Sequence, residues 1–404
     1  MSDKVHLMTP LMPERAEDLQ DIALDVIQKS AALAGRQHTR TIETLQKFLR
    51  IINSYYSNLI EGHNTHPYDI VRAMQKEYDV ESAKRDLQIE SVAHITVQGY
   101  MEETLKNDPK LNVAGREFLC FLHQKFYMYL PDGFRVVKDE KTGRESLIAP
   151  GMLRTEPVIV GRHRPPDHDS VLTLMEQFSS AYAPEKYHGA LKFVAAAAAH
   201  HRLMWIHPFL DGNGRVARLF TEAYLHRIPV KGFGLWSVSR GFARKSDEYK
   251  FRLAGADALR RNDLDGRGNL SNEGLVQFCR FFLDACLDQV EYMDRLLQLD
   301  ELMDRIRKYI ELRSAGVIPT PIGKSALRIE SARMLQEALI KGEIARGPVI
   351  TVSGLKERTG RTLLGQLIDE GLLVSDSPKG DVRMGFPVHA AGWFFPELYP
   401  TSAK

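Results

Sequence analysis

The sequence is poor in cysteine and has no long apolar run. Its three cysteines, Cys120, Cys279 and Cys286, show no CxxC spacing and lie in apolar stretches of helical character. They therefore predict buried free thiols rather than a disulfide framework or a zinc site. No stretch reaches the roughly 20 apolar residues that a membrane span needs, and the N-terminus lacks a basic segment followed by an apolar one. We expect a cytoplasmic protein that is neither secreted nor membrane-spanning.

An excess of charge of one sign is also absent. The chain has 54 Lys and Arg against 52 Asp and Glu, a net charge of +2, so its composition implies no polyanionic partner. Its 404 residues exceed what one hydrophobic core usually organises, which predicts two or three domains.

Apolar residues recur at helical spacing through most of the first 320 positions, which predicts a mainly α-helical protein. One interruption occurs over residues 134–166, where valine-rich segments at 135–137 and 158–160 flank a turn-rich stretch. This pattern predicts a β-hairpin, or flap, that projects from a helical body.

The C-terminal part has a different character. An amphipathic pattern over 271–314 predicts a long connecting helix, and residues 352–387 suggest a helix, a turn at Gly360, a second helix and two strands, the order of a winged helix. Exposed residues of the second helix that could meet DNA phosphates are Arg358, Arg361 and Thr362. Winged helices also serve as protein-docking or dimerising modules, so both readings stay open, and DNA is the less favoured partner because basic residues are few.

The stretch HPFLDGNGRVAR, from His207 to Arg218, contains the most informative chemistry. It separates two apolar helices, so its polar residues fall where a helix begins near Asn213 and presents unpaired backbone N–H groups to an anion. Gly212 and Gly214 allow the backbone to approach a diphosphate closely.

Four side chains complete this anion site. Arg215 and Arg218 lie three residues apart, so both can reach phosphate oxygens from one face of the first helical turn. Asp211 offers the oxygen ligand that Mg²⁺ prefers, and His207 titrates in the range that proton transfer needs. A glycine turn between two core helices would explain the glycines, Pro208 and Phe209, but not these four residues together.

The stretch matches the Fic motif, HPFx[D/E]GNGRxxR, at every defined position. The resemblance implies that His207 deprotonates a protein hydroxyl, which attacks the α-phosphate of ATP, and that Asp211 holds Mg²⁺. It also implies that Phe209 anchors the loop in the core and that the ATP phosphates meet Gly212, Asn213, Gly214, Arg215 and Arg218.

Two looser similarities extend this resemblance. The segment 151–161 is similar to the flap with which Fic proteins pair an extended target segment, which would make docking residues of Gly151, Arg154, Val158 and Val160. Ser239, Arg240 and Tyr249 fall where the family often closes the nucleoside pocket, although Tyr249 serves equally well as a core aromatic.

The segment 57–62, SNLIEG, matches the inhibitory motif of the family, [S/T]xxxE[G/N]. The resemblance implies that Glu61 pairs with Arg218 and withholds it from the γ-phosphate, because an arginine held by a carboxylate is unavailable to a phosphate. Ser57 shares the helical face of Glu61 and could hold it by a hydrogen bond. A surface pair followed by a Gly62 cap is the alternative that the segment alone favours.

These patterns together predict a Fic-type helical bundle with a flap and a C-terminal winged helix. The expected parts are an N-terminal helical region (1–110), a catalytic core (111–270), a connecting helix (271–320) and a winged-helix domain (321–404). The expected activity is AMP transfer from ATP to a Ser, Thr or Tyr hydroxyl, with self-modification and homodimer formation as further expectations. A nucleotide-sensing DNA-binding regulator and a Fic enzyme of altered chemistry, such as a deAMPylase, are the alternatives.

Overall fold

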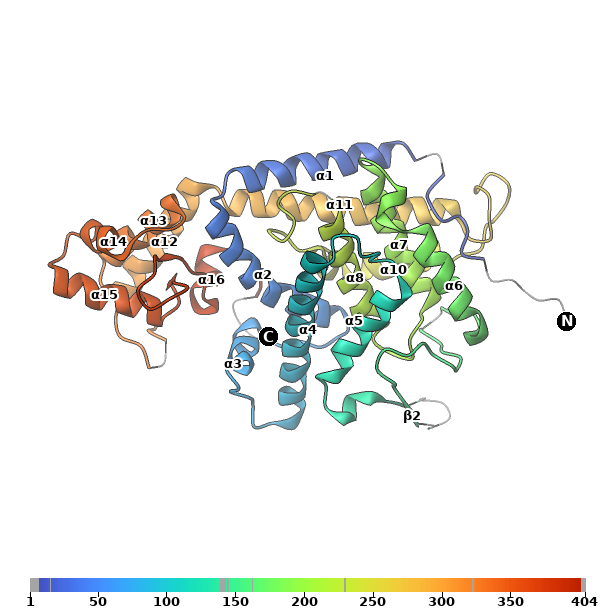
Figure 1. Cartoon of the computed structure of the whole chain (residues 1–404), viewed down its shortest axis with the longest axis horizontal. Coiled ribbons are helices and arrows are strands. Elements are labelled where there is room, and N and C mark those ends of the chain that lie inside the picture. Colours follow the sequence, from blue (N-terminus) through green and yellow to red (C-terminus); the bar gives the residue numbers. More distant parts are fainter. Residues whose placement is uncertain are drawn as a thin grey trace.

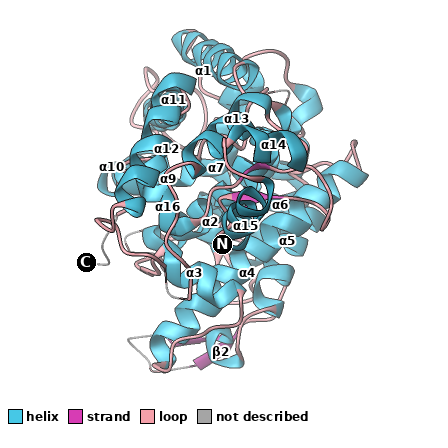
Figure 2. Cartoon of the chain, turned by 90° about the vertical axis from the view of Figure 1, so that its left-hand side faces the viewer, coloured by secondary structure: helices cyan, strands magenta, loops and turns pink. Residues whose placement is uncertain are grey.

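The computed structural model describes residues 7–14, 16–138, 143, 145–161, 163–228, 230–321 and 323–400. Within these ranges the chain is mainly helical, as its periodicity predicts (Figure 2). The first half contains α1 (Asp18–Gly35), α2 (Thr39–Ile60), α3 (Pro67–Met74), α4 (Ser82–Asn107), α5 (Arg116–Met128), the 3-10 helix η1 (Asp132–Arg135), β1 (Val136–Lys138), β2 (Glu145–Leu147), α6 (His168–Ala181), η2 (Pro184–Lys186) and α7 (Leu191–Ile206). The second half contains α8 (Asn213–Arg227), α9 (Val238–Arg244), α10 (Ser246–Ala256), α11 (Asn272–Leu296), α12 (Leu299–Ser314), α13 (Ser331–Lys341), α14 (Arg346–Val352), α15 (Glu357–Asp369), β3 (Leu373–Val374), β4 (Arg383–Met384) and α16 (Val388–Phe394).

Helix α7 lies at the centre of the helical body and packs against α6, α8 and α11. Five consecutive alanines, residues 195–199, are fully buried on this helix. Small side chains on every face let the neighbouring helices approach closely. The packing fixes both α7 and α8, and the HPFLDGNGRVAR stretch spans the turn between them.

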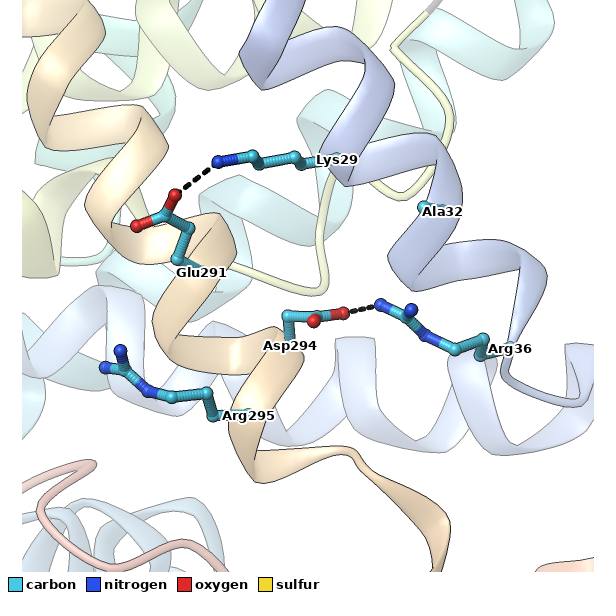
Figure 3. A pocket seen from close by; sticks show the side chains of 6 residues that line it. All are labelled: Lys29, Ala32, Arg36, Glu291, Asp294 and Arg295. Atoms are coloured by element: carbon cyan, nitrogen blue, oxygen red, sulfur yellow. Dashed lines mark hydrogen bonds and ion pairs between the residues drawn. The ribbon is translucent and has the colours of Figure 1, made fainter.

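Helices α1 and α11 run side by side along one edge of the molecule (Figure 1). Their apolar faces meet, and ion pairs join Lys29 to Glu291 and Arg36 to Asp294 across an open groove (Figure 3). The four groups are partly exposed, so the pairs add little stability beyond the apolar contact.

The flap contains a small hairpin, but its strand pairing differs from the prediction. Strand β1 pairs antiparallel with β2, with Val136 opposite Leu147, whereas the second predicted segment, 158–160, forms an isolated bridge between Val160 and His163. Residues 158–160 are richer in β-forming residues than β2, but β2 is nearer to β1 in the chain and closes the shorter loop. The predicted tip includes residues 139–142 and 144, which lie outside the described residues.

The predicted connecting helix is two helices, α11 and α12. Gln298 between them has an extended backbone (φ −60°, ψ 122°), which ends the helical path. The Arg305 side chain stabilises the bend by donating to the carbonyl oxygens of Leu296 and Phe394. The bend allows α12 to pack against α13 and α16.

The C-terminal unit, residues 331–394, has helices followed by a two-stranded antiparallel sheet, but its predicted turn is misplaced. Gly360 lies inside α15, where a Cβ would come within 2.6 Å of Ile350 Cγ2, so this glycine serves close helix packing. The turn lies at residues 353–356 and contains Gly354 at a φ of +73°. Arg361, a predicted phosphate contact, is paired with Glu357 at 2.6 Å.

The C-terminal tail returns to the helical body beside α2 (Figure 1). The Leu398 carbonyl accepts hydrogen bonds from Tyr56 Oη (2.8 Å) and Arg240 Nε (3.2 Å). The prediction that Arg240 closes a nucleoside pocket therefore fails, since its side chain is buried against the tail. The sequence alone does not indicate that the Arg240 side chain donates hydrogen bonds to the C-terminal tail.

The cysteines are free, and Cys279 and Cys286 are buried, as predicted, whereas Cys120 is only half-buried. Among the described residues, no helix combines the length and apolar character needed to cross a membrane.

Candidate active site

The turn between α7 and α8 gives His207 an unusual backbone. His207 ends α7 with φ +50° and ψ 61°, the left-handed region that residues with a Cβ rarely adopt. Phe209 directly after it is fully buried and stacks on His123, with ring centroids 4.1 Å apart. The predicted anchoring role of Phe209 in the core is confirmed.

Arg154 holds this turn in place. Its Nε donates to the His207 carbonyl (2.8 Å), its guanidinium also donates to the carbonyls of Glu156 and Pro166, and its backbone N–H donates to Pro208 O. The residue is 5% exposed. The Arg154 side chain therefore stabilises the turn around His207, and the docking of a target by the flap at this residue stays a prediction.

Burial sets the protonation state of His207. Desolvation, aided by the nearby His163, lowers the pKa of His207 to about 4. The imidazole is consequently neutral near pH 7 and can accept a proton from a bound hydroxyl group.

The N-terminus of α8 has the features of an anion site. No side chain caps it, and Gly212 at its N-cap has a φ of +78°, with space for a Cβ blocked by the Tyr127 ring at 2.8 Å. Asn213 behaves differently from the prediction, because its side-chain amide bonds the backbone N–H and carbonyl of Phe209. Asn213 thus closes the loop, while the backbone N–H groups of the first turn of α8 have no acceptor within the helix.

Asp211 retains a negative charge at this helix end. Burial opposes that charge, but Arg215 and a hydrogen bond from Tyr127 Oη (2.8 Å) outweigh it and hold the pKa of Asp211 below its ordinary value. Its side chain is 47% exposed. An ionised, accessible carboxylate has the chemistry that a Mg²⁺ ligand needs.

Glu61 and Arg218 are in contact, although 157 positions separate them in sequence. Arg218 Nη2 donates to Glu61 Oε1 at 2.6 Å, and the Arg218 side chain is 2% exposed. Burial works against the Glu61 charge, but Arg218 and Arg215 outweigh it and lower the pKa of Glu61. The pair is therefore ionic at neutral pH.

Ser57 has a different partner from the predicted one. Its Oγ accepts from Arg218 Nε (2.9 Å), and its carbonyl accepts from Arg218 Nη2 (3.0 Å). Ser57 and Glu61 thus hold the same arginine from one face of α2.

The Glu61 carboxylate also reaches the start of α8. A Cβ at Gly214 would overlap Glu61 Oε1, so the carboxylate lies directly against the backbone of the first turn. This is the position at which the N-terminus of α8 would meet a phosphate.

Sequence analysis missed two residues that extend this network, Glu90 and His63. Glu90 on α4 accepts from Arg215 Nη1, and its second oxygen lies 2.5 Å from His63 Nδ1. The hydrogen bond to Glu90 raises the pKa of His63 against the effect of burial. Glu90 belongs to no motif, and an acidic residue within a buried helical face was the only available signal.

Tyr249 is a core residue in the structure. It is 2% exposed, stacks on Phe242 with ring centroids 4.7 Å apart and shares a 2.7 Å hydrogen bond with His200 Nε2. This agrees with the alternative that the sequence left open and gives no support to contact with adenine.

The flap presents an apolar edge beside this site. Gly151 N donates to His123 Nδ1 at 2.8 Å, which ties the start of the flap to the motif loop. Beyond Arg154, Ile159 and Val160 are 63% and 43% exposed while Val158 is half-buried.

Comparison with known proteins identifies the domain around this site. Residues 114–225 match the model of the Fic/DOC family. The chain contains a Fic domain. Similar curated proteins include the protein adenylyltransferase Fic of Drosophila grimshawi, 38% identical over 175 residues, and that of Drosophila mojavensis, 36% identical over 117 residues. These matches cover 43% and 29% of the chain, but only 32% and 23% of the two relatives.

Solved structures share the fold. A Fic family protein from Desulfovibrio desulfuricans G20 aligns with a TM-score of 0.51 and 16% identity over 94% of this chain and 97% of its own. Fic-1 from C. elegans (residues 134–508) aligns with a TM-score of 0.52 and 15% identity over 69% of this chain and 72% of its own. At these identities the likeness concerns the fold alone. The Fic fold thus extends beyond the 112 positions of the family match.

Proposed function

We propose that the chain is a protein adenylyltransferase that moves AMP from ATP to a Ser, Thr or Tyr hydroxyl of a protein. The observation that carries the proposal is the neutral His207 beside the uncapped N-terminus of α8, within a Fic domain. The name of the curated relatives, protein adenylyltransferase, supports the same reaction.

The residues have separate tasks in this reaction. His207 takes the proton of the acceptor hydroxyl, whose oxygen then bonds to the α-phosphorus of ATP as pyrophosphate leaves. The N–H groups at Gly212 to Gly214, together with Arg215 and Arg218, bind the phosphates. Asp211 would hold Mg²⁺, which neutralises phosphate charge when bound.

Glu61 acts as an inhibitor of this site. Its carboxylate occupies Arg218 and the backbone at Gly214, both of which an ATP phosphate would need. A phosphate that approaches them meets a negative charge instead of free donors. Ser57 strengthens the inhibition by holding Arg218 toward α2.

The flap docks the target. The segment 158–160 has exposed apolar side chains at Ile159 and Val160, and we expect a target segment to add main-chain hydrogen bonds along the flap there. Because such bonds use the backbone, they position the acceptor hydroxyl with little demand on its neighbours in sequence.

ATP labelled at either the α- or the γ-phosphate distinguishes this reaction from other phosphate transfers. The Glu61→Gly variant is incubated with each label in lysate and alone, with Glu61→Gly/His207→Ala as the matched control. We expect protein-bound label from α-labelled ATP only, on the chain itself as well as on targets. Label from γ-labelled ATP would indicate phosphorylation and contradict the proposal, as would equal α-label in the control.

A further inference from the structure

Glu90 touches the Fic motif although no motif of the sequence includes it. Its side chain is 0% exposed, with one oxygen on Arg215 Nη1 and the other on His63 Nδ1. A carboxyl group at this depth needs such partners to satisfy its oxygens. Since His63 directly follows the segment that carries Glu61, one side chain links the end of α2 to α8.

The Arg215 guanidinium is shared between two unlike carboxylates. Nη1 donates to the fully buried Glu90, whereas Nη2 donates to Asp211 at 3.2 Å, whose side chain is 47% exposed. The guanidinium carbon also lies 5.0 Å from the centre of the Phe126 ring, which supports one face of the group. One edge of the guanidinium is therefore fixed in the interior, and the other lies at the accessible end of α8.

We propose that Glu90 is a positioning residue for ATP: it holds Arg215 by Nη1 so that the Nη2 edge is directed at the phosphates. The proposal rests on the proposed function, in which Arg215 binds phosphate. A guanidinium fixed by a charge-assisted bond loses less freedom when it binds an anion, so the anion binds more tightly.

The different burial of Glu90 and Glu61 argues against a second inhibitory role. Glu61 is 33% exposed at the end of a helix and can leave Arg218, whereas Glu90 is enclosed on α4. A phosphate that displaced Glu90 would leave a buried carboxylate with one partner fewer, at a high cost in free energy.

Equilibrium binding of ATP tests the role of Glu90. Glu90→Gln and Glu90→Ala are each made in the Glu61→Gly parent, and calorimetry gives Kd for ATP with and without Mg²⁺, alongside KM, kcat and Tm. We expect Kd and KM to rise about tenfold in the alanine variant and less in the glutamine variant, which keeps an acceptor for Nη1. The kcat values should change less than KM.

Glu222→Gln is the matched control. Glu222 is a buried carboxyl group on α8 that accepts from Gln98 on α4 at 2.6 Å, in the same interface. Burial raises the pKa of Glu222 to about 8, and among the described residues it forms no hydrogen bond or ion pair with Arg215. Its substitution should alter Tm and leave Kd for ATP unchanged. If Glu90→Ala does not fold, the Kd and KM for ATP of the isosteric Glu90→Gln variant test the role of Glu90.

Two results would overturn the positioning role. One is a folded Glu90→Gln variant with the same Kd and KM for ATP as its parent, because Glu90 would then have only a structural role. The other is tighter ATP binding, which would make Glu90 inhibitory. A parent that binds ATP without transferring AMP would refute the proposed function, while the Kd series would still test Glu90. A parent that binds no ATP would contradict both.

Discussion

His207 depends on its neighbours for both its conformation and its charge state. The positive φ at this position is costly for a residue with a Cβ, and the donors of Arg154 hold the adjoining carbonyls in place. Desolvation keeps the ring neutral. The motif showed which residue could act as a base, but the residue that braces it was read as part of a docking surface, since sequence does not show which way a flap side chain points.

Replacing His207 by alanine should remove the base without removing the phosphate contacts. We expect the AMP-transfer rate of the Glu61→Gly parent to fall by about 10²- to 10⁴-fold, with Kd for ATP unchanged. Radiolabel transfer and calorimetry on the same preparations measure the two quantities. Undiminished transfer would exclude His207 as the base.

The pH dependence of transfer reports the pKa of His207. A general base acts only when unprotonated, so lowering its pKa from 6.5 to about 4 keeps it active at lower pH. We expect the initial rate in the Glu61→Gly parent to be level through pH 6.5 and to fall only as the pH approaches about 4. Circular dichroism at each pH checks the fold. If the rate instead reaches half of its maximum near pH 6.5, burial does not lower the pKa of His207.

At the scale of elements, the C-terminus of α2 contacts the N-terminus of α8 at this site. Glu61 caps the C-terminus of α2, an end that disfavours negative charge, but its carboxylate lies at the N-terminus of α8, which favours it. Arg218 completes the contact. The pairing of Glu61 with Arg218 was predictable because the resemblance supplied both partners.

Other element-level features could not be read from the sequence, for physical reasons. Gly360 looked like a turn residue, but it allows two helices to pack closely, and glycine is suited to both tasks. The strand partner of β1 was misjudged because residues 158–160 (VIV) have the higher β-propensity, whereas β2 (ESL) pairs with β1 because it lies nearer in the chain. The contact of Glu90 with Arg215 could not be predicted, because only the folded structure brings α4 against α8.

Removing Arg218 should reduce ATP binding and also make the Glu61 substitution ineffective. We expect Arg218→Ala to weaken productive ATP binding about tenfold or more, since a charged phosphate contact is lost. Adding Glu61→Gly to Arg218→Ala should then give little further gain in transfer, which a double-mutant cycle of initial rates measures. A double variant much more active than Arg218→Ala would mean that Glu61 inhibits through another group.

Across the whole molecule, α2 contacts both β4 of the C-terminal unit and the tail that follows this unit. The tail carbonyl of Leu398 accepts a hydrogen bond from Tyr56, the residue before Ser57, and Tyr399 packs against His66, just beyond segment 57–62. The helix that carries Glu61 therefore touches both parts of the chain. Whether the C-terminal unit is a winged helix that docks protein or DNA stays a prediction.

The Tyr56 contact is open to a stability test. Tyr56→Phe removes the 2.8 Å hydrogen bond to Leu398 O and leaves a buried carbonyl with one partner fewer. We expect the free energy of unfolding to fall by about 1 kcal/mol, measured by urea denaturation. Tyr68→Phe, at a side chain 46% exposed, is the control and should have little effect. Equal stability of Tyr56→Phe and wild type would show that this bond contributes nothing net.

The inhibitory role of Glu61 is tested most directly by comparing initial AMP-transfer rates of wild type and Glu61→Gly at saturating Mg²⁺-ATP, with thermal unfolding of each. We expect the variant to be faster by about tenfold or more, including self-modification, because a charged pair worth ~1.5–3 kcal/mol no longer competes with the phosphate. Glu43→Gly, about five turns earlier on α2, controls for the cost of glycine in this helix and should leave the rate unchanged. Equal rates for wild type and Glu61→Gly, with a lowered Tm in the variant, would contradict autoinhibition.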